Sequence, residues 1–182
     1  MSDHATLNFK FSEYGVVPSE LRGNVKRNAE QLEILRESFD GAAVSVWSGV
    51  RTVANNRGAK NSQHLYGRAA DITIAGTTAR EVYLRVLKLV SEGRMLQGGV
   101  GYYAPRAGGK GNFTHYDTRG NKARWWMDSS GKVHSGVPSW ALSVDKGDGL
   151  SFTELDEDQD IGSGTDSDGA GVVGGLDLVG AF

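Results

Sequence analysis

Residues 62–75 read SQHLYGRAADITIA and join a polar loop to a hydrophobic segment. The segment 71–75 is rich in isoleucine and threonine, which favours a β-strand. Small residues, among them Gly67, precede it and permit two backbones to approach closely. The sequence therefore predicts a loop that folds back onto the end of a strand and brings His64 toward Asp71.

Two helices and three further strands are expected around this segment. Residues 19–39 carry apolar side chains at three- and four-residue steps after Pro18, the pattern of an amphipathic helix. Thr78 and Glu81 have the spacing of a capping box, so a second helix is expected to begin at residue 79. The further strands are expected at 43–47, 98–103 and 113–117. Helices beside a small, mostly antiparallel sheet define an α+β fold.

Composition divides the chain of 182 residues into a basic body and an acidic tail. Residues 1–142 hold 19 of the 20 Lys and Arg and 12 of the 22 Asp and Glu, a net charge of +7, whereas residues 143–182 carry −9. We expect a single domain at 1–142 and a tail rich in Gly and Asp at 143–182, either disordered or docked on a partner. The basic body suits a polyanionic partner, or is a plain solvated surface.

The chain has no cysteine, so any metal must be held by histidine and carboxylate side chains. His4 lies near a terminus and His134 in an apparent turn, and we expect both at the surface. His64, Asp71 and His115 together make the ligand set of a catalytic zinc site, two imidazoles and one carboxylate. By spacing alone, ordinary hydrogen-bonded polar residues remain the simpler interpretation.

Three motifs follow one another along the chain around these residues. They are Ser48-Gly49-x-Arg51, Ser62-x-His64-x-x-Gly67-x-Ala69-x-Asp71 and Phe113-x-His115-x-Asp117. With residues 8–14, residues 98–102 and Arg124-Trp125, they resemble the M15 family of zinc D-Ala-D-Ala peptidases, most closely its short type from bacteria and phages. The resemblance covers residues 8–126 and leaves the tail outside.

The resemblance implies a site and an activity. His64, Asp71 and His115 are implied to bind Zn²⁺, and Arg51 to face the scissile carbonyl or a substrate carboxylate. The implied reaction is hydrolysis of a peptide bond in bacterial peptidoglycan, by a D,D-carboxypeptidase or an endopeptidase that cuts cross-bridges. The family fold, a small antiparallel sheet with flanking helices, agrees with the pattern of elements above.

The chain departs from the family pattern at Asn112. Many members have Asp or Glu three residues before the last zinc histidine, and an asparagine cannot accept a proton as a base. Asp117 is the substitute candidate, because two residues along a strand it shares a face with His115. It acts either as the general base or as the carboxylate that accepts the imidazole N–H and fixes the tautomer. Asp117 and Arg51 are thus the candidate catalytic residues.

Five aromatic residues of this region either line a substrate groove or belong to the core. They are Tyr102, Tyr103, Tyr116, Trp125 and Trp126. A serine nucleophile at Ser62 is not expected, because no base stands in partnership with it.

The alternative function is that of a non-catalytic, zinc-binding component of a phage tail or injection assembly. The tail at 143–182 suits docking on tail or particle proteins in either case. Nucleic-acid binding is not expected, because no such motif accompanies the basic body. The start MSDHATLNFKF lacks the pattern of a signal peptide, and no apolar run is long enough to span a membrane. We expect synthesis in the cytoplasm and action at the cell wall, after lysis or as part of a particle.

Overall fold

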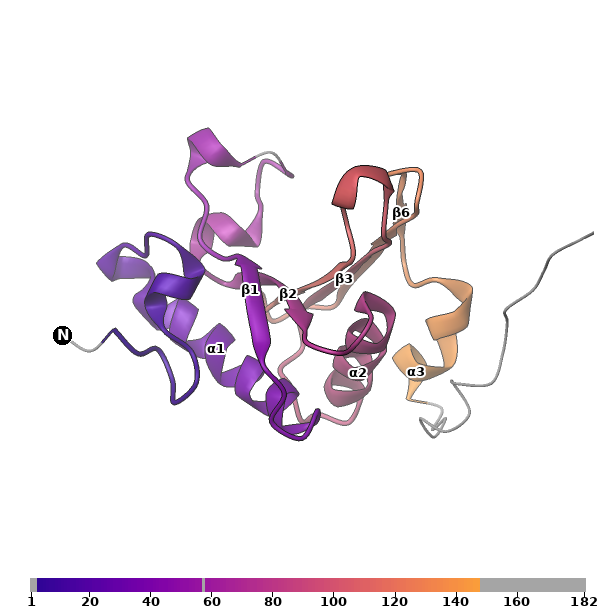
Figure 1. The fold of residues 1–182 in the computed structure, drawn as a ribbon, viewed down its shortest axis with the longest axis horizontal. Helices are drawn as coiled ribbons and strands as arrows, with labels where there is room; N and C mark the ends of the chain where they lie inside the picture. The colour runs from indigo at the N-terminus through magenta and orange to yellow at the C-terminus, as the bar shows by residue number, and fades with distance from the viewer. Residues whose placement is uncertain (1–2, 57, 148–182) are drawn as a thin grey trace, which may run out of the picture. The chain divides into compact units, whose positions relative to one another are not determined.

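The computed structural model of the chain describes residues 3–56 and 58–147. Within them, six strands form one sheet in the order β1-β2-β4-β3-β5-β6 (Figure 1). Neighbouring strands run antiparallel, except that β3 and β5 are parallel. The strands are β1 Val44–Ser48, β2 Ala69–Ile74, β3 Gly99–Tyr103, β4 Phe113–Asp117, β5 Ala123–Met127 and β6 Val133–Ser135. The predicted α+β fold with a small, mostly antiparallel sheet is confirmed.

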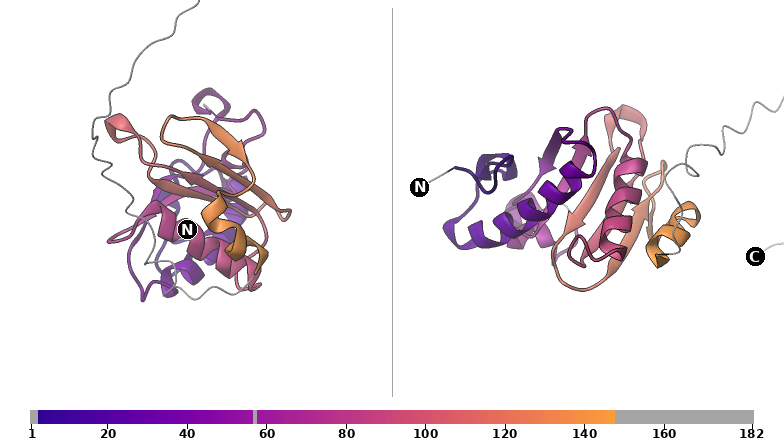
Figure 2. Two further views of the ribbon diagram at one scale, coloured as in Figure 1. Left: turned by 90° about the vertical axis from the view of Figure 1, so that its right-hand side faces the viewer. Right: turned by 90° about the horizontal axis from the view of Figure 1, so that it is seen from below.

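Two helices, α1 Arg22–Glu37 and α2 Ala79–Ser91, lie side by side against one face of the sheet (Figure 2, right). The predicted capping box starts α2, since the Thr78 hydroxyl accepts from the backbone N–H of Glu81 at 3.2 Å and the Glu81 carboxylate accepts from the N–H of Thr78. The α-helical part of α1 begins later than expected, because Ser19–Leu21 form a 3-10 turn first.

The core lies between these helices and the sheet. Ile72 and Ile74 of β2, Val100 of β3 and Tyr116 of β4 are all buried, as are most apolar residues of both helices. Because side chains alternate along a strand, the residues between them lie on the opposite face. That second face is therefore free to carry polar side chains, and it carries the site described below.

One prediction for the end of the sheet is wrong. His134 lies in β6, opposite Trp126 of β5, and not in a turn. The turn precedes it, at residues 128–132, where the Asp128 carboxylate accepts from the backbone N–H of Lys132 at 3.0 Å. The imidazole of His134 stacks on the Trp126 indole with ring centroids 4.1 Å apart, which holds it on the sheet.

A short helix, α3 Leu142–Lys146, contacts α2 and spans the expected boundary after residue 142. Its Asp145 accepts hydrogen bonds from Lys122 at 2.7 Å and from Arg124 at 2.8 Å. Burial alone would raise the pKa of Asp145, but the bonds from Lys122 and Arg124 outweigh it and lower the pKa. The acidic tail from residue 148 onward lies outside the described residues. No helix in the described part of the chain is long and apolar enough to cross a membrane.

Candidate metal centre

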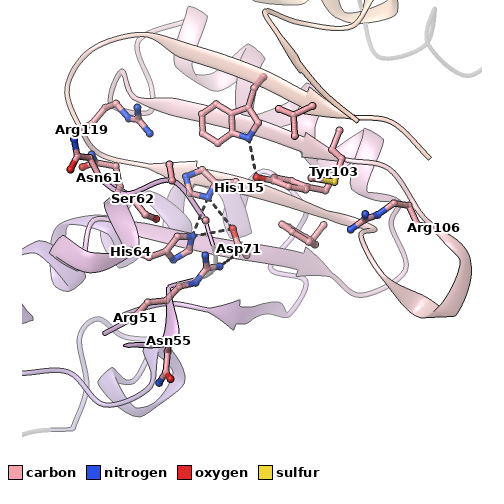
Figure 3. Close-up of a pocket in the computed structure, with 17 residues that line it drawn as sticks. Arg51, Asn55, Asn61, Ser62, His64, Asp71, Tyr103, Arg106, His115 and Arg119 are labelled. Atoms are coloured by element: carbon pink, nitrogen blue, oxygen red, sulfur yellow. Dashed lines mark hydrogen bonds and ion pairs between the residues drawn. The ribbon is translucent and has the colours of Figure 1, made fainter. Parts of the chain in front are cut away.

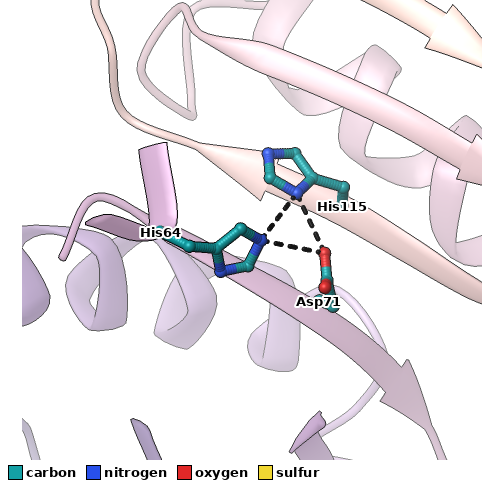
Figure 4. A group of neighbouring side chains, drawn as sticks. All are labelled: His64, Asp71 and His115. Carbon is teal, nitrogen blue, oxygen red and sulfur yellow. Dashed lines mark hydrogen bonds and ion pairs between the residues drawn. The ribbon is translucent and has the colours of Figure 1, made fainter. Parts of the chain in front are cut away.

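The sheet brings together the three side chains that the sequence singled out. Asp71 in β2 and His115 in β4 are cross-strand partners, and the Asp71 Oδ1 atom lies 2.9 Å from His115 Nδ1. His64 Nε2 lies 3.2 Å from His115 Nδ1 and 3.3 Å from Asp71 Oδ1 (Figure 4). All three residues are buried. These atoms form a compact group that is suited to hold one metal ion.

A tight reversal of the chain delivers His64 to this group. His64 lies in a 3-10 helix, Gln63–Tyr66, which ends at Gly67 in the left-handed conformation with φ +64°. A Cβ added at Gly67 would lie 3.2 Å from both Leu21 Cβ, in the 3-10 turn before α1, and Val25 Cγ2 of α1. The left-handed backbone and the tight space both favour glycine, and the small residue noted in the sequence marks this reversal.

Hydrogen bonds on the outer side of each imidazole select the tautomer that binds metal. His64 Nδ1 donates to the carbonyl oxygen of Gly49 at 2.6 Å, and His115 Nε2 donates to Asp117 Oδ2 at 3.0 Å. Both acceptors lack a proton to give, so each ring places its N–H outward and a lone pair inward. Three acceptor atoms then face one another, and only a cation, either an added proton or a metal ion, relieves their repulsion.

The local electrostatics keep the carboxylates ionised. Burial alone would raise the pKa of Asp71; in the metal-free site, hydrogen bonds from His115 and His64, which require an added proton on the inward nitrogen, outweigh burial and hold the pKa well below its usual range. Burial likewise acts to raise the pKa of Asp117, and bonds from His115 and Arg119 lower it. For His115 the signs reverse: burial acts to lower its pKa, and the bonds to Asp117 and Asp71 raise it.

Asp117 lies behind His115 and does not line the pocket. Its Oδ1 atom accepts from the backbone N–H of Gly99 at 3.0 Å and from Arg119 Nε at 2.8 Å, and its Oδ2 atom accepts from Arg119 Nη2 at 2.6 Å as well as from His115. Glycine makes room for this carboxylate, since a Cβ at Gly99 would lie 2.3 Å from Asp117 Oδ2. Of the two roles weighed for Asp117, this placement favours the one that orients the imidazole.

Arg51 stands at the edge of the same group. Its Nη2 atom donates to Asp71 Oδ2 at 2.5 Å, and its Nε atom donates to the Ser48 hydroxyl at 2.9 Å. The carboxylate of Asp71 is thereby divided, with Oδ1 toward the imidazoles and Oδ2 toward the guanidinium. Asn112, by contrast, is exposed with a φ of +60°, a conformation that asparagine tolerates, and it does not line the pocket.

The triad opens into a cavity of about 910 Å³ (Figure 3). Arg51, Arg106 and Arg119 line it, together with aromatic side chains that include Tyr103 and Trp125. Among the described residues, Asp71 is the only carboxylate in the lining. The pocket is therefore cationic and partly aromatic, and it gives solvent and ligand access to the metal-binding atoms.

Tyr103 and Trp125 form a hydrogen-bonded pair that no local sequence pattern indicates. The indole Nε1 atom of Trp125 donates to the Tyr103 hydroxyl at 3.0 Å, which leaves the hydroxyl proton of Tyr103 free to donate to a ligand. Gly101 makes this possible, since a Cβ there would lie 2.5 Å from the indole ring. Gly99 and Gly101, at alternate positions of β3, were the sequence signal for a close approach on this face of the sheet.

The other three aromatic candidates lie elsewhere. Tyr116 is buried in the core and donates to the carbonyl oxygen of Leu96. Tyr102 packs against Tyr83 and Trp140 on the helix side of the sheet. Trp126 stacks on His134. Only Tyr103 and Trp125 of the five line the pocket.

Two histidines and one aspartate that converge in the lining of an open cavity form a candidate site for a single metal ion, a ligand set of the kind found in metal-dependent hydrolases. The family model described as Peptidase M15 matches residues 4–117, a span that contains the triad, Arg51 and Asp117. The chain therefore belongs to the peptidase M15 family, and the resemblance seen in the sequence is confirmed. No curated protein matches the chain.

Proposed function

We propose that this protein is a zinc-dependent peptidase that hydrolyses peptide bonds of bacterial peptidoglycan, as a D,D-carboxypeptidase or an endopeptidase. The observation that carries the proposal is the pair of outer hydrogen bonds on the imidazoles. Gly49 and Asp117 turn the lone pairs of His64 and His115 toward Asp71, inside an accessible pocket. A bound zinc ion would supply a Lewis acid and an acidified water at that point.

The chain's own residues then have distinct tasks. His64, Asp71 and His115 would hold the ion, and Asp117 would keep His115 in its ligand tautomer. Arg51 would keep Asp71 ionised and present its remaining N–H groups to a substrate carbonyl or carboxylate. Burial raises the pKa of the Tyr103 phenol, so it stays protonated and would donate its O–H to the oxygen on which negative charge develops.

Water must lose a proton to the leaving amine during hydrolysis, and the described pocket offers no second carboxylate for this transfer. That observation favours a second candidate function, a zinc-binding module without turnover in a phage tail or injection assembly. The acidic tail at 143–182 would then dock on other proteins of the particle, whereas in a phage enzyme it would serve release or packaging.

The test uses the full chain and purified peptidoglycan. With bound zinc, we expect release of soluble fragments, new amino groups or free D-alanine, and a chelator should abolish the release. The His64→Ala variant should lose both zinc and activity, while His134→Ala, which alters a histidine outside the pocket, should keep both. An inert protein that still binds one zinc ion per chain would favour the module, and a chain that binds no zinc would contradict both functions.

A further inference from the structure

The cations of the pocket are not equally compensated. Two of the three arginines in the lining are paired with a carboxylate: Arg51 with Asp71 and Arg119 with Asp117. Arg106 has no such partner among the described residues, and its Nε atom is buried without a hydrogen-bond partner. A metal ion at the triad would add further positive charge. The pocket thus has an uncompensated cation that calls for a ligand anion.

The position of Arg106 is set by the turn between β3 and β4. Its backbone N–H donates to the carbonyl oxygen of Lys110 at 2.8 Å, which closes the turn. Its guanidinium passes over Gly131, where an added Cβ would lie 2.7 Å from Nη1. Figure 3 shows the guanidinium directed into the cavity, on the side of the triad opposite Arg119. The side chain is therefore held in the pocket wall and directed at whatever occupies the cavity.

The surroundings strengthen a bond to an anion. The rings of Tyr103 and Phe113 stack with centroids 4.3 Å apart. Together with Met127 they form an apolar part of the pocket wall. Poorly hydrated walls increase the attraction between unlike charges. A guanidinium offers a planar pair of N–H groups that fits a carboxylate with two parallel hydrogen bonds.

We propose that Arg106 binds a free carboxylate of the peptide substrate, on the part of the peptide that lies over the β3–β4 turn. This inference rests on the proposed peptidase function and specifies its substrate class. The enzyme should select peptides that carry a carboxylate at that position over the same peptides with an amide there. Arg51 would contact the group that reacts, so the two arginines would bind different parts of the substrate.

The experiment uses peptidoglycan stem-peptide fragments in which each carboxyl group is converted to an amide, one at a time. For the wild-type chain, one of these amides should lower kcat/KM by about 10- to 100-fold, the usual effect of losing a hydrogen-bonded charge. Arg106→Gln should lower kcat/KM on the acid by a similar factor and leave the amide unchanged. Arg106→Lys should fall between them. Arg94→Gln, a change at an exposed arginine beside Glu92, is the matched control.

Binding of the same peptides, measured by isothermal titration, separates this inference from the peptidase function. If no peptide is cut but Arg106→Gln still removes a preference for the acid in binding, the peptidase function fails and the role of Arg106 stands. If peptides are cut and the ratio of acid to amide is the same in wild type and Arg106→Gln, the role of Arg106 is overturned. Absence of both cleavage and binding also overturns it. Zinc content and thermal melting show that each variant is folded.

Discussion

Replacing Asp117 with asparagine tests how the metal centre is built, because the change keeps the shape and removes the charge. The carboxylate accepts hydrogen bonds from His115, Arg119 and the backbone of Gly99. An asparagine has a single acceptor oxygen, so its NH₂ group must face one of these donors. If it faces His115, the ring must carry its proton on Nδ1, the atom that would bind the metal. If the NH₂ group faces Arg119 and Gly99, its N–H groups point at the N–H groups of these two residues, and no hydrogen bond can form.

Either orientation of the new amide group should weaken zinc binding, by an amount that can be estimated. Loss of an outer partner of a metal-binding histidine costs about 10- to 100-fold in metal affinity, or about 1.4–2.7 kcal/mol. In addition, leaving a buried donor without a hydrogen bond lowers the free energy of unfolding by about 1–3 kcal/mol. We therefore expect Asp117→Asn to bind zinc more weakly than wild type, and to unfold at lower denaturant concentration.

Competition with a chromophoric chelator measures zinc affinity, and chemical denaturation of the zinc-free chain measures stability. Asp128→Asn is the matched control, because Asp128 accepts from His134 Nε2 at 2.8 Å in the same kind of pair but outside the pocket. Zinc affinity equal to that of wild type would refute the orienting role. Complete loss of zinc, as expected for His64→Ala, would instead make Asp117 a ligand.

Three further changes probe the rest of the site and the fold. Arg51→Gln should keep zinc bound and lower kcat/KM on peptidoglycan fragments about 100-fold; loss of zinc would contradict this role. Tyr103→Phe should lower kcat by a similar factor at unchanged zinc content, and unchanged kcat would exclude its O–H from the reaction. The lowered pKa of Asp145 adds stability at pH values above its ordinary 3.8 that is lost as the pH falls toward the folded value. Denaturation over a pH series should show a weaker acid dependence in Asp145→Asn, and identical slopes would oppose the assignment.

Local rules predict which face of the sheet Asp71 and His115 occupy, whereas the grouping of the two with His64 was implied by the family resemblance. Strand alternation places Asp71 on the face opposite Ile72 and Ile74, and the same rule puts His115 and Asp117 on one face. It does not reveal that Asp71 and His115 are opposite one another, because that register depends on β4 lying between β2 and β3. The pairing of distant strands is decided by packing of the whole sheet and not by either segment alone.

The missed features all depend on such distant pairings. Trp125 reaches Tyr103 only because β5 lies beside β3 and runs parallel to it. No local sequence pattern predicts this pairing. Arg106, in the turn between β3 and β4, enters the pocket beside Gly131 of the turn between β5 and β6. In each case a glycine marks the close approach, but a glycine in a sequence does not say which distant residue needs the space.

Each carboxylate of the site is shared between a guanidinium and the histidines of the triad. Arg51 holds one oxygen of Asp71 while the other faces the imidazoles, and Arg119 holds Asp117 while it accepts from His115. The arginines stabilise the ionised carboxylates, so the ligand tautomers persist. They would also withdraw electron density from a metal ion bound at the triad. Such a site should hold its ion less tightly than an isolated triad, and the ion, less neutralised by its ligands, should polarise a substrate carbonyl more strongly.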